Sequence, residues 1–239
     1  MSFAHGKNTA VFYNGSNLTA YFNEASTSNS VEVAETTAFG NDAKTYVAGL
    51  VDGTISTSGM FDGSTGAVDS VLSGVIGATA ADVVTIAPDG AVAGRRSFSC
   101  SARETSYEIT SPVGDVVAVS LEVQATEGID DGYLLAANSA VSASANGSSV
   151  NNSAGTTNGG VGFLHFTANT RDGASTFKVQ HSTDNSTFVD LITFTSVSAS
   201  ATGGERVAVT GTVNQYVRAQ HVPGGSSGSV TYTMAFARK

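Results

Sequence analysis

Residues 54–72 of this chain read TISTSGMFDGSTGAVDSVL, and residues 176–192 read TFKVQHSTDNSTFVDLI. With one gap, the Asp-x-Ser-Thr string that begins at Asp62 falls on the one that begins at Asp184. Each segment opens with alternating Thr, Ser, Ile, Phe and Val, which favours a strand, and each then reaches an Asp-led turn. The two stretches therefore predict β-strands that end in Asx turns.

A second pair of segments is also similar. Residues 107–125 and 216–236 each contain a strand pattern, a Gly-containing tip and a second alternating strand. Two interpretations are open. The chain contains one β unit used twice, which suggests a protein that tiles, or it contains unrelated hairpins that share turn chemistry.

The composition points to a mainly β protein. Only 13% of the residues are charged, and Gly, Ser, Thr, Ala and Val dominate. No apolar run approaches the roughly 20 residues of a membrane span, and residues 1–7 lack the apolar core of a signal peptide, so we expect no membrane association. The single cysteine, Cys100, excludes an intramolecular disulfide and is expected to be a small buried strand residue.

One helix is predicted at about residues 65–77. Its apolar positions follow a 3.6-residue period, and Ser64-Thr65 and Gly77 are candidate caps. The stripe consists of Val68, Val71, Leu72, Val75 and Ile76.

These patterns predict three regions. Residues 1–130 form a β domain with that one helix, and residues 131–160, rich in Ala, Ser, Asn and Gly, form a linker or weakly packed edge. Residues 161–239 form a second all-β module, either an independent unit or a diverged copy of the first.

The residues give little support for catalysis. The string Gly224-Gly-Ser-Ser-Gly228 matches G-x-S-x-G, but it joins two predicted strands instead of a strand and a helix. The four histidines, of which His165 and His181 could meet across a sheet, have no metal-ligand spacing. Asp62 is better explained by an Asx turn than by acid–base chemistry. We therefore expect no enzyme, no metal and no cofactor.

Charge is unevenly distributed. Residues 1–130 hold 15 acidic and 5 basic side chains, whereas residues 131–239 hold 5 acidic and 6 basic ones. An acidic surface repels the phosphates of nucleic acid, so specific DNA binding is not expected.

Residues 31–62 read VEVAETTAFGNDAKTYVAGLVDGTISTSGMFD. This run resembles the major tail tube proteins of long-tailed, non-contractile bacteriophages, in which an E-x-T-x-F-G-x-x-x-K-x-Y-x-x-G-L-x-D-G-x-x-x-x-x-G-x-F-D run recurs. The C-terminal stretches QHSTDNSTFVDL and YTMAFAR also look like the second half of such proteins. The matching positions in the first run are Glu35, Thr37, Phe39, Gly40, Lys44, Tyr46, Gly49, Leu50, Asp52, Gly53, Gly59, Phe61 and Asp62.

The resemblance implies a tail-tube-like β-sandwich or barrel with a flanking helix. Such a protein is a structural virion component that self-assembles into stacked rings, through which DNA passes during ejection without specific binding. It implies a location in the virion tail after assembly in the host cytoplasm, with tape measure, tip and terminator proteins as further partners. By resemblance, the contacts between subunits or rings fall to Phe39, Gly40, Lys44, Tyr46, Gly49 and Leu50.

Two arrangements are consistent with the two interpretations of the repeats. If both halves are tube-like modules, three chains supply six quasi-equivalent positions in a trimer with pseudo-sixfold symmetry. Otherwise residues 1–130 form a hexamer and the second module decorates its outside. An alternative function is a β-sandwich binding module that recognises a ligand on the host surface.

Overall fold

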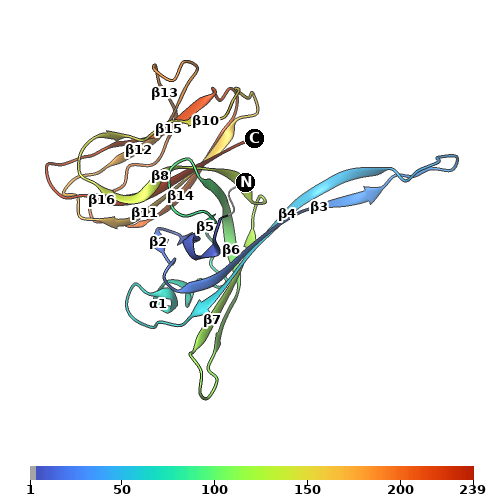
Figure 1. Ribbon diagram of the computed structural model, residues 1–239, viewed down its shortest axis with the longest axis horizontal. Coiled ribbons are helices and arrows are strands. Elements are labelled where there is room, and N and C mark those ends of the chain that lie inside the picture. The colour runs from blue at the N-terminus through green and yellow to red at the C-terminus, as the bar shows by residue number, and fades with distance from the viewer. Residues whose placement is uncertain (1–3) are drawn as a thin grey trace.

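A computed structural model describes residues 4–239, and nearly all of its regular structure is β (Figure 1). These residues form two antiparallel sheets and one short α-helix, so the predicted mainly β fold is confirmed. The elements of the first half are η1 Gly6–Asn8, β1 Ala10–Tyr13, β2 Ser16–Asn17, β3 Phe22–Glu35, β4 Tyr46–Met60, α1 Val68–Leu72, β5 Asp82–Ala87, β6 Arg96–Thr110 and β7 Ala118–Ala125. Those of the second half are β8 Asp130–Val141, β9 Ala145–Asn146, β10 Val150–Asn151, β11 Gly160–Asn169, β12 Thr176–Ser182, β13 Val189–Thr193, β14 Gly203–Val209, β15 Tyr216–Val222 and β16 Val230–Arg238.

The larger sheet runs through both halves of the chain. Its order is β14-β11-β16-β8-β6-β5-β1-β2, and β7, β4 and β3 extend from β6 in that order. The smaller sheet has the order β10-β15-β12-β13, with β9 beside β15. Strands from both halves therefore share one hydrogen-bonded sheet.

The first half packs one face of the sheet β3-β4-β7-β6 against β1, β5 and α1. Burial alternates along β7, where Val119, Leu121 and Val123 face the core and the residues between them face solvent. This two-residue period is the pattern of a strand with one covered face. The core below the sheet also contains Tyr13, Leu18, Ile55, Val68, Leu72, Val84, Ile86 and Cys100, so the predicted burial of Cys100 is confirmed.

The second half is a sandwich of β8, β11, β14 and β16 against the smaller sheet. Its core contains Leu135, Leu164, Phe177, Val179, Ile192, Phe194, Val217, Val230, Tyr232, Met234 and Phe236. Residues 160–165 of β11 are all buried, because this strand is covered on both faces.

The stretch predicted as a linker, 131–160, instead begins with a central strand. β8 pairs with β6 on one side and β16 on the other, and Leu134 and Leu135 are fully buried. Its small residues serve close packing: a Cβ on Gly132 would lie 2.3 Å from the carbonyl oxygen of Phe236. Composition alone cannot separate such a strand from a linker, because Ala, Ser and Gly suit both.

Side chains also join the two halves. The Gly15 N–H donates to His165 Nδ1 at 3.3 Å, and His165 Nε2 lies 2.9 Å from Thr85 Oγ1. Arg206 of β14 forms an ion pair with Glu127 at 2.5 Å. A third apolar cluster spans the boundary and contains Ala10, Phe12, Val83, Ala87, Leu134, Val161, Phe163 and Ala235. The second half is thus fixed to the first by a shared sheet and core.

The helix is shorter than the predicted 65–77. It ends at Leu72 because Ser73 is extended and Gly74 has a φ of 104°. Its N-cap residue is Ala67, which makes no side-chain capping bond, so the expected cap by Ser64-Thr65 is wrong. The predicted Asx turn is confirmed, since Asp62 Oδ1 accepts the Ser64 N–H at 2.9 Å.

The repeated segments share their turns but differ in the elements after those turns. Asp184 Oδ1 accepts the N–H groups of Ser186 and Thr187 at 2.9 and 2.8 Å, as predicted for an Asx turn. The first turn leads into α1 and the second into β13. In the other pair, β6 and β7 bond to one another, whereas β15 and β16 lie in different sheets.

Candidate assembly surfaces

The longest projection of the molecule is the hairpin of β3 and β4 (Figure 1). The two strands pair from Phe22↔Gly59 to Glu35↔Tyr46, but β7 covers β4 only from Thr54 to Met60. Residues 30–52 therefore form a two-stranded ribbon, which we call the arm. β4 starts at Tyr46, so residues 46–50 belong to this ribbon. An isolated two-stranded hairpin is at best marginally stable in water, so the arm gains little stability from its own pairing.

The apolar row of the hairpin does not end where the body ends. Ile55 and Thr57 of β4 are buried in the core, and the same face continues outward through Val51 and its strand partner Val31. Side chains two apart on a strand share a face, so Val33 lies on this row as well. The row of side chains that is buried in the core therefore continues along the arm, where it is exposed to solvent.

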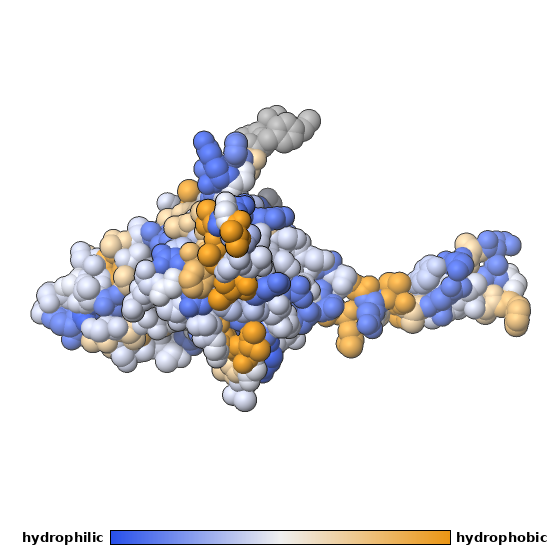
Figure 2. Space-filling model, turned by 90° about the horizontal axis from the view of Figure 1, so that it is seen from below, coloured by the Kyte–Doolittle hydropathy of each residue, from blue (hydrophilic) through white to orange (hydrophobic). Residues whose placement is uncertain are grey.

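Hydrophobic side chains gather along the arm, as Figure 2 shows on the projecting part of the surface. Leu50 is 77% exposed, and Phe39 is fully exposed. The exposed large hydrophobic residues of the arm are Val31, Val33, Phe39, Tyr46, Val47, Leu50 and Val51. Surfaces of this kind are typical of interaction sites.

The residues that the resemblance assigns to contacts lie at two levels of the arm. Phe39 and Gly40 are in the terminal turn, where Gly40 has a φ of 94°. Lys44 Nζ lies 3.0 Å from Glu35 Oε2, and Tyr46 is the strand partner of Glu35.

The other two residues form a bulge. The pairing passes from Val31↔Val51 to Val33↔Ala48, which leaves Gly49 and Leu50 opposite one residue. Bulges re-aim side chains and break regular edges. The sequence reasoning missed Val31, Val33, Val47 and Val51, although the alternation in VEV was a usable signal.

The base of the arm is tied to the loop between β7 and β8. Asn29 Nδ2 donates to the Ile129 carbonyl at 2.9 Å, and the Ile129 N–H donates to Asn29 Oδ1 at 3.2 Å. Gln124 Nε2 donates to the Gly53 carbonyl at 3.0 Å and also contacts Asp52. These bonds fix the direction in which the arm leaves the body.

The uncovered face of the sheet β3-β4-β7-β6 has an unusual composition. It forms a shallow hollow of about 320 Å³, lined by hydroxyl groups and carboxylates. The residues of this acidic face are Glu24, Ser26, Ser56, Ser58, Ser106, Glu108, Ser120 and Glu122. Every charged member is negative.

The same sheet has two free edges. β3 pairs only with β4, so one side of its 14 residues is unpaired. β6 pairs with β7 over residues 102–110, whereas β5 covers its other side only from Phe98 to Ala102. Long unpaired edges are pairing sites unless they are protected.

Glu104 is a carboxylate on the covered face of β6. It is 6% exposed, and among residues 4–239 neither of its side-chain oxygens has a hydrogen-bond partner. Burial, and then the neighbouring Asp82 carboxylate, raises its pKa to about 7. Beside it, the Tyr13 hydroxyl donates to Asp82 at 2.9 Å, and the Tyr107 hydroxyl donates to Asp69 of α1 at 2.9 Å.

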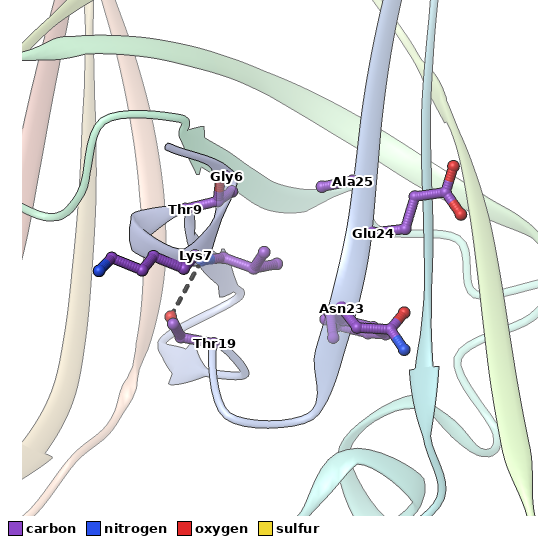
Figure 3. A pocket seen from close by; sticks show the side chains of 9 residues that line it. Gly6, Lys7, Thr9, Thr19, Asn23, Glu24 and Ala25 are labelled. Atoms are coloured by element: carbon purple, nitrogen blue, oxygen red, sulfur yellow. Dashed lines mark hydrogen bonds between the residues drawn. The ribbon is translucent and has the colours of Figure 1, made fainter. Parts of the chain in front are cut away.

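A separate cavity of about 450 Å³ lies between η1 and the start of β3 (Figure 3). The N–H of Val11 donates to Thr19 Oγ1 at 3.0 Å on one side, and Ala25 lies on the other. Its charged lining residues are Lys7 and Glu24. The cavity adjoins the free edge of β3 but gathers no set of catalytic groups.

The other sequence candidates have structural roles. The Asp172 carboxylate accepts hydrogen bonds from the N–H and hydroxyl groups of Ser226 and Ser227. The G-x-S-x-G string is therefore a loop that Asp172 holds in place. His165 is hydrogen-bonded to Gly15 and Thr85, and His181 lies in the other sheet. Among residues 4–239, no cluster of three or more His, Cys, Asp or Glu side chains is arranged to hold a metal ion. Over the same range, no helix is long and apolar enough to cross a membrane.

No protein-family model and no curated protein matches this sequence. Similar solved structures include the tail of an empty GTA particle with C6 symmetry, at 14% identity and a TM-score of 0.45, where the match covers 53% of this chain and 97% of the other. The virion of a native gene transfer agent particle matches at 13% identity and a TM-score of 0.45, covering 54% and 98%. The Dit protein of phage SPP1, described as a hub adsorption apparatus protein, matches at 15% identity and a TM-score of 0.38, covering 96% and 99%. At such low identities and TM-scores, these likenesses assign neither a family nor a function to this chain.

Proposed function

We propose that this protein is a structural component of a phage tail that polymerises into the wall of the tail tube. The observation that carries the proposal is the arm, with its row of exposed hydrophobic residues on a marginal two-stranded ribbon. Burying that row against a second copy would remove each large side chain from water, at roughly 1.5–3 kcal/mol for full burial. The run of residues 31–62 that resembles tail tube proteins covers the arm.

The sheet edges support assembly into rings. The free edge of β3 and the free edge of β6 lie on opposite sides of one four-stranded sheet. Pairing β3 of one copy with β6 of the next is a heterologous contact, which closes into a ring when the rotation between copies allows it. Repetition would leave no edge unpaired.

The acidic face supports the wall of a bore. Ring closure through the two edges leaves one face of the sheet on the inside, and α1, β1 and β5 cover the opposite face. The inner lining would then be hydroxyl groups with Glu24, Glu108 and Glu122. Duplex DNA carries one negative charge per about 1.7 Å of helix axis, so this lining would not hold it.

Strand numbers favour a hexamer over a trimer. Three four-stranded sheets would close a barrel of about 12 strands, fewer than the roughly 16–18 strands that leave an aqueous channel, whereas six would close about 24. A trimer would also need a second wall sheet in each chain. Residues 160–165 are buried on both faces, so β11, the second-half strand of the larger sheet, has no bare face to offer.

The partners follow from this role. Other copies of the chain would be the main partner, and tape measure, tip and terminator proteins would meet the assembled tube. The protein would reside in the virion tail after assembly in the host cytoplasm. No catalytic step belongs to this role.

Negative-stain electron microscopy of the concentrated, purified protein tests the proposal. We expect hollow tubes or stacked rings with sixfold symmetry in averaged images. A variant with residues 30–52 replaced by Asn-Gly keeps the covered sheet but should give no tubes. Dispersed particles for the native chain, or tubes from the shortened variant, would contradict the role of the arm.

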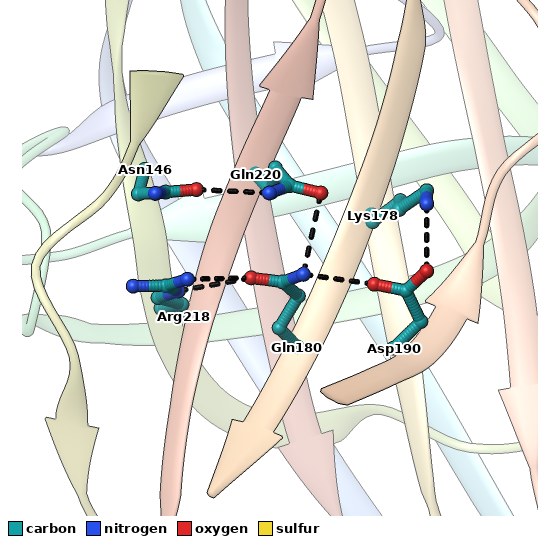
Figure 4. Close-up of polar contacts among 6 residues, drawn as sticks. All are labelled: Asn146, Lys178, Gln180, Asp190, Arg218 and Gln220. Carbon is teal, nitrogen blue, oxygen red and sulfur yellow. Dashed lines mark hydrogen bonds and ion pairs between the residues drawn. The ribbon is translucent and has the colours of Figure 1, made fainter. Parts of the chain in front are cut away.

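A second function, recognition of a host-surface ligand by residues 161–239, is favoured by one observation. The outer face of the smaller sheet carries a fixed row of polar side chains (Figure 4). Deleting the second module would expose the shared core, so this function is better tested by substitutions on that face.

A further inference from the structure

The outer face of the smaller sheet presents a connected polar row across β9, β15, β12 and β13 (Figure 4). The strand register places Gln180 beside Arg218 on one side and Asp190 on the other, and Lys178 beside Gln220. Residues two apart on a strand share a face, so these side chains all lie opposite the sandwich core. Asn146 extends the row through its bond to Gln220, at 3.0 Å.

Gln180 is the centre of the row and is only 6% exposed, although it faces outward. Its Oε1 accepts two bonds from Arg218, from Nε at 3.0 Å and from Nη2 at 2.8 Å. Its Nε2 donates to Asp190 Oδ1 at 2.8 Å and to Gln220 Oε1 at 3.2 Å. Side chains held this way have already lost their rotamer freedom, which reduces the cost of binding a ligand.

Arg218 is held in place but has no counter-ion. Its guanidinium carbon lies 3.9 Å from the centre of the Phe188 ring, and its nearest fixed partner is the neutral amide of Gln180. Among residues 4–239 it forms no ion pair, and Nη1 has no hydrogen-bond partner. Burial lowers the pKa of the Arg218 guanidinium.

The charged side chains next to Arg218 on this face are already paired with one another. Lys178 and Asp190 neutralise one another at 2.6 Å, so the uncompensated charge of the row is that of Arg218. The planar fork of arginine matches carboxylate and phosphate groups. The chain as a whole carries a net charge of −9, so attraction of an anion requires such a local site.

We propose that this face binds an acidic polysaccharide, with Arg218 pairing to an oxyanion of the sugar chain. The flanking groups suit a saccharide, because Phe188 and Tyr216 offer ring surface while Asn146 and Gln220 offer amide groups to hydroxyls. The oxyanion is a uronic carboxylate or a sugar phosphate. This inference is independent of tube formation, since it concerns only the outer face of the second module.

Surface plasmon resonance of the full chain over immobilised polygalacturonate, polyphosphate and neutral dextran tests the proposal at about 0.15 M salt. We expect retention on at least one anionic polymer and none on dextran. The Arg218→Gln variant should lose at least tenfold in affinity. Stronger retention on polygalacturonate identifies a carboxylate, and stronger retention on polyphosphate identifies a phosphate.

Arg206→Gln is the matched control, because Arg206 already pairs with Glu127, and it should bind as the native chain does. If a thermal unfolding assay shows that Arg218→Gln does not fold, the Arg218→Lys variant replaces it. That variant keeps the positive charge but lacks the planar guanidinium, so it should bind the anionic polymers more weakly than the native chain. Tube formation raises the avidity of the native chain and of each assembling variant alike, so their affinities can still be compared with one another. Absence of retention on both anionic polymers, equal retention on dextran, or full binding by the Arg218 variant would overturn the proposal.

Discussion

Asn29 and Ile129 are joined by two hydrogen bonds, from Asn29 Nδ2 to the Ile129 carbonyl at 2.9 Å and from the Ile129 N–H to Asn29 Oδ1 at 3.2 Å. The residues are 100 positions apart, and the pair marks the point at which the arm leaves the body. Beyond it the hairpin has no third strand.

Asn29→Ala should therefore loosen the arm. The substitution leaves a backbone donor and acceptor unpaired, which costs about 1–3 kcal/mol of unfolding free energy. Urea unfolding measures this loss, and electron microscopy should reveal irregular or shortened tubes. Asn23→Ala is the control, because Asn23 is exposed on the same strand. Equal unfolding midpoints for the two variants would show that the pair contributes nothing.

Replacing Lys44 and Tyr46 together with Ala should impair assembly and leave the fold intact. Lys44 forms only an exposed ion pair with Glu35, and such pairs contribute about 0–1 kcal/mol. Thermal unfolding should change little, while sedimentation should show far fewer polymers. Normal tubes from this double variant would contradict the proposed role of the distal arm in contacts between subunits.

Reversing the charge of the acidic face should make the tube adhere to DNA. The Glu108→Lys/Glu122→Lys variant places cations where the bore lining is proposed, and their contacts with phosphates should weaken steeply as salt rises. Co-sedimentation of tubes with duplex DNA at low and high salt measures the effect. An Asp89→Lys/Asp115→Lys variant carries the same charge change outside both that face and the arm, and it should retain no DNA within its bore. Equal retention by both variants would show that net charge, and not this face, decides adhesion.

Stability should fall as the pH rises towards 7, because of Glu104. Its pKa is raised from 4.5 to about 7 in the folded protein, chiefly by burial, so the folded chain holds this proton more tightly than the unfolded chain. The resulting stabilisation is fully present below about pH 4.5 and is lost as the pH passes through 7. Glu104→Gln mimics the protonated form and should remove this part of the pH dependence. Thermal unfolding between pH 5 and 8.5 tests this prediction. The unfolding temperature of the variant should equal that of the native chain at pH 5 and should be higher than that of the native chain at pH 8.5. Parallel curves across the range would mean that Glu104 is ionised throughout.

Several features could be predicted from sequence because their causes are local. The alternation of apolar residues predicted a mainly β chain, and Asp62 and Asp184 bond to the next N–H groups along the chain, so their turns needed no distant partner. The apolar spacing after Ala67 placed a helix correctly but too long. Gly74, with its positive φ, ends that helix before the predicted stripe is complete.

The regions that sequence reasoning misjudged depend on distant contacts. Residues 130–141 have the composition of a linker, yet β6 and β16 bond to them on both sides. The similar segments 107–125 and 216–236 diverge because each second strand finds a different partner. The contact residues proposed by resemblance lie in the arm, but the row of Val31, Val33 and Val51 became visible only with the register of β3 and β4.

The class of fold and the turns can be read from the sequence alone, since period and turn chemistry act over a few neighbours. The tertiary structure was needed to show that the two halves share one sheet, that the apolar row of the core continues along the arm, and that Arg218 has no ion-pair partner among residues 4–239. Each of these depends on which strands pair. Strand pairing is set by the burial of residues that lie tens of positions apart, and no local pattern records it.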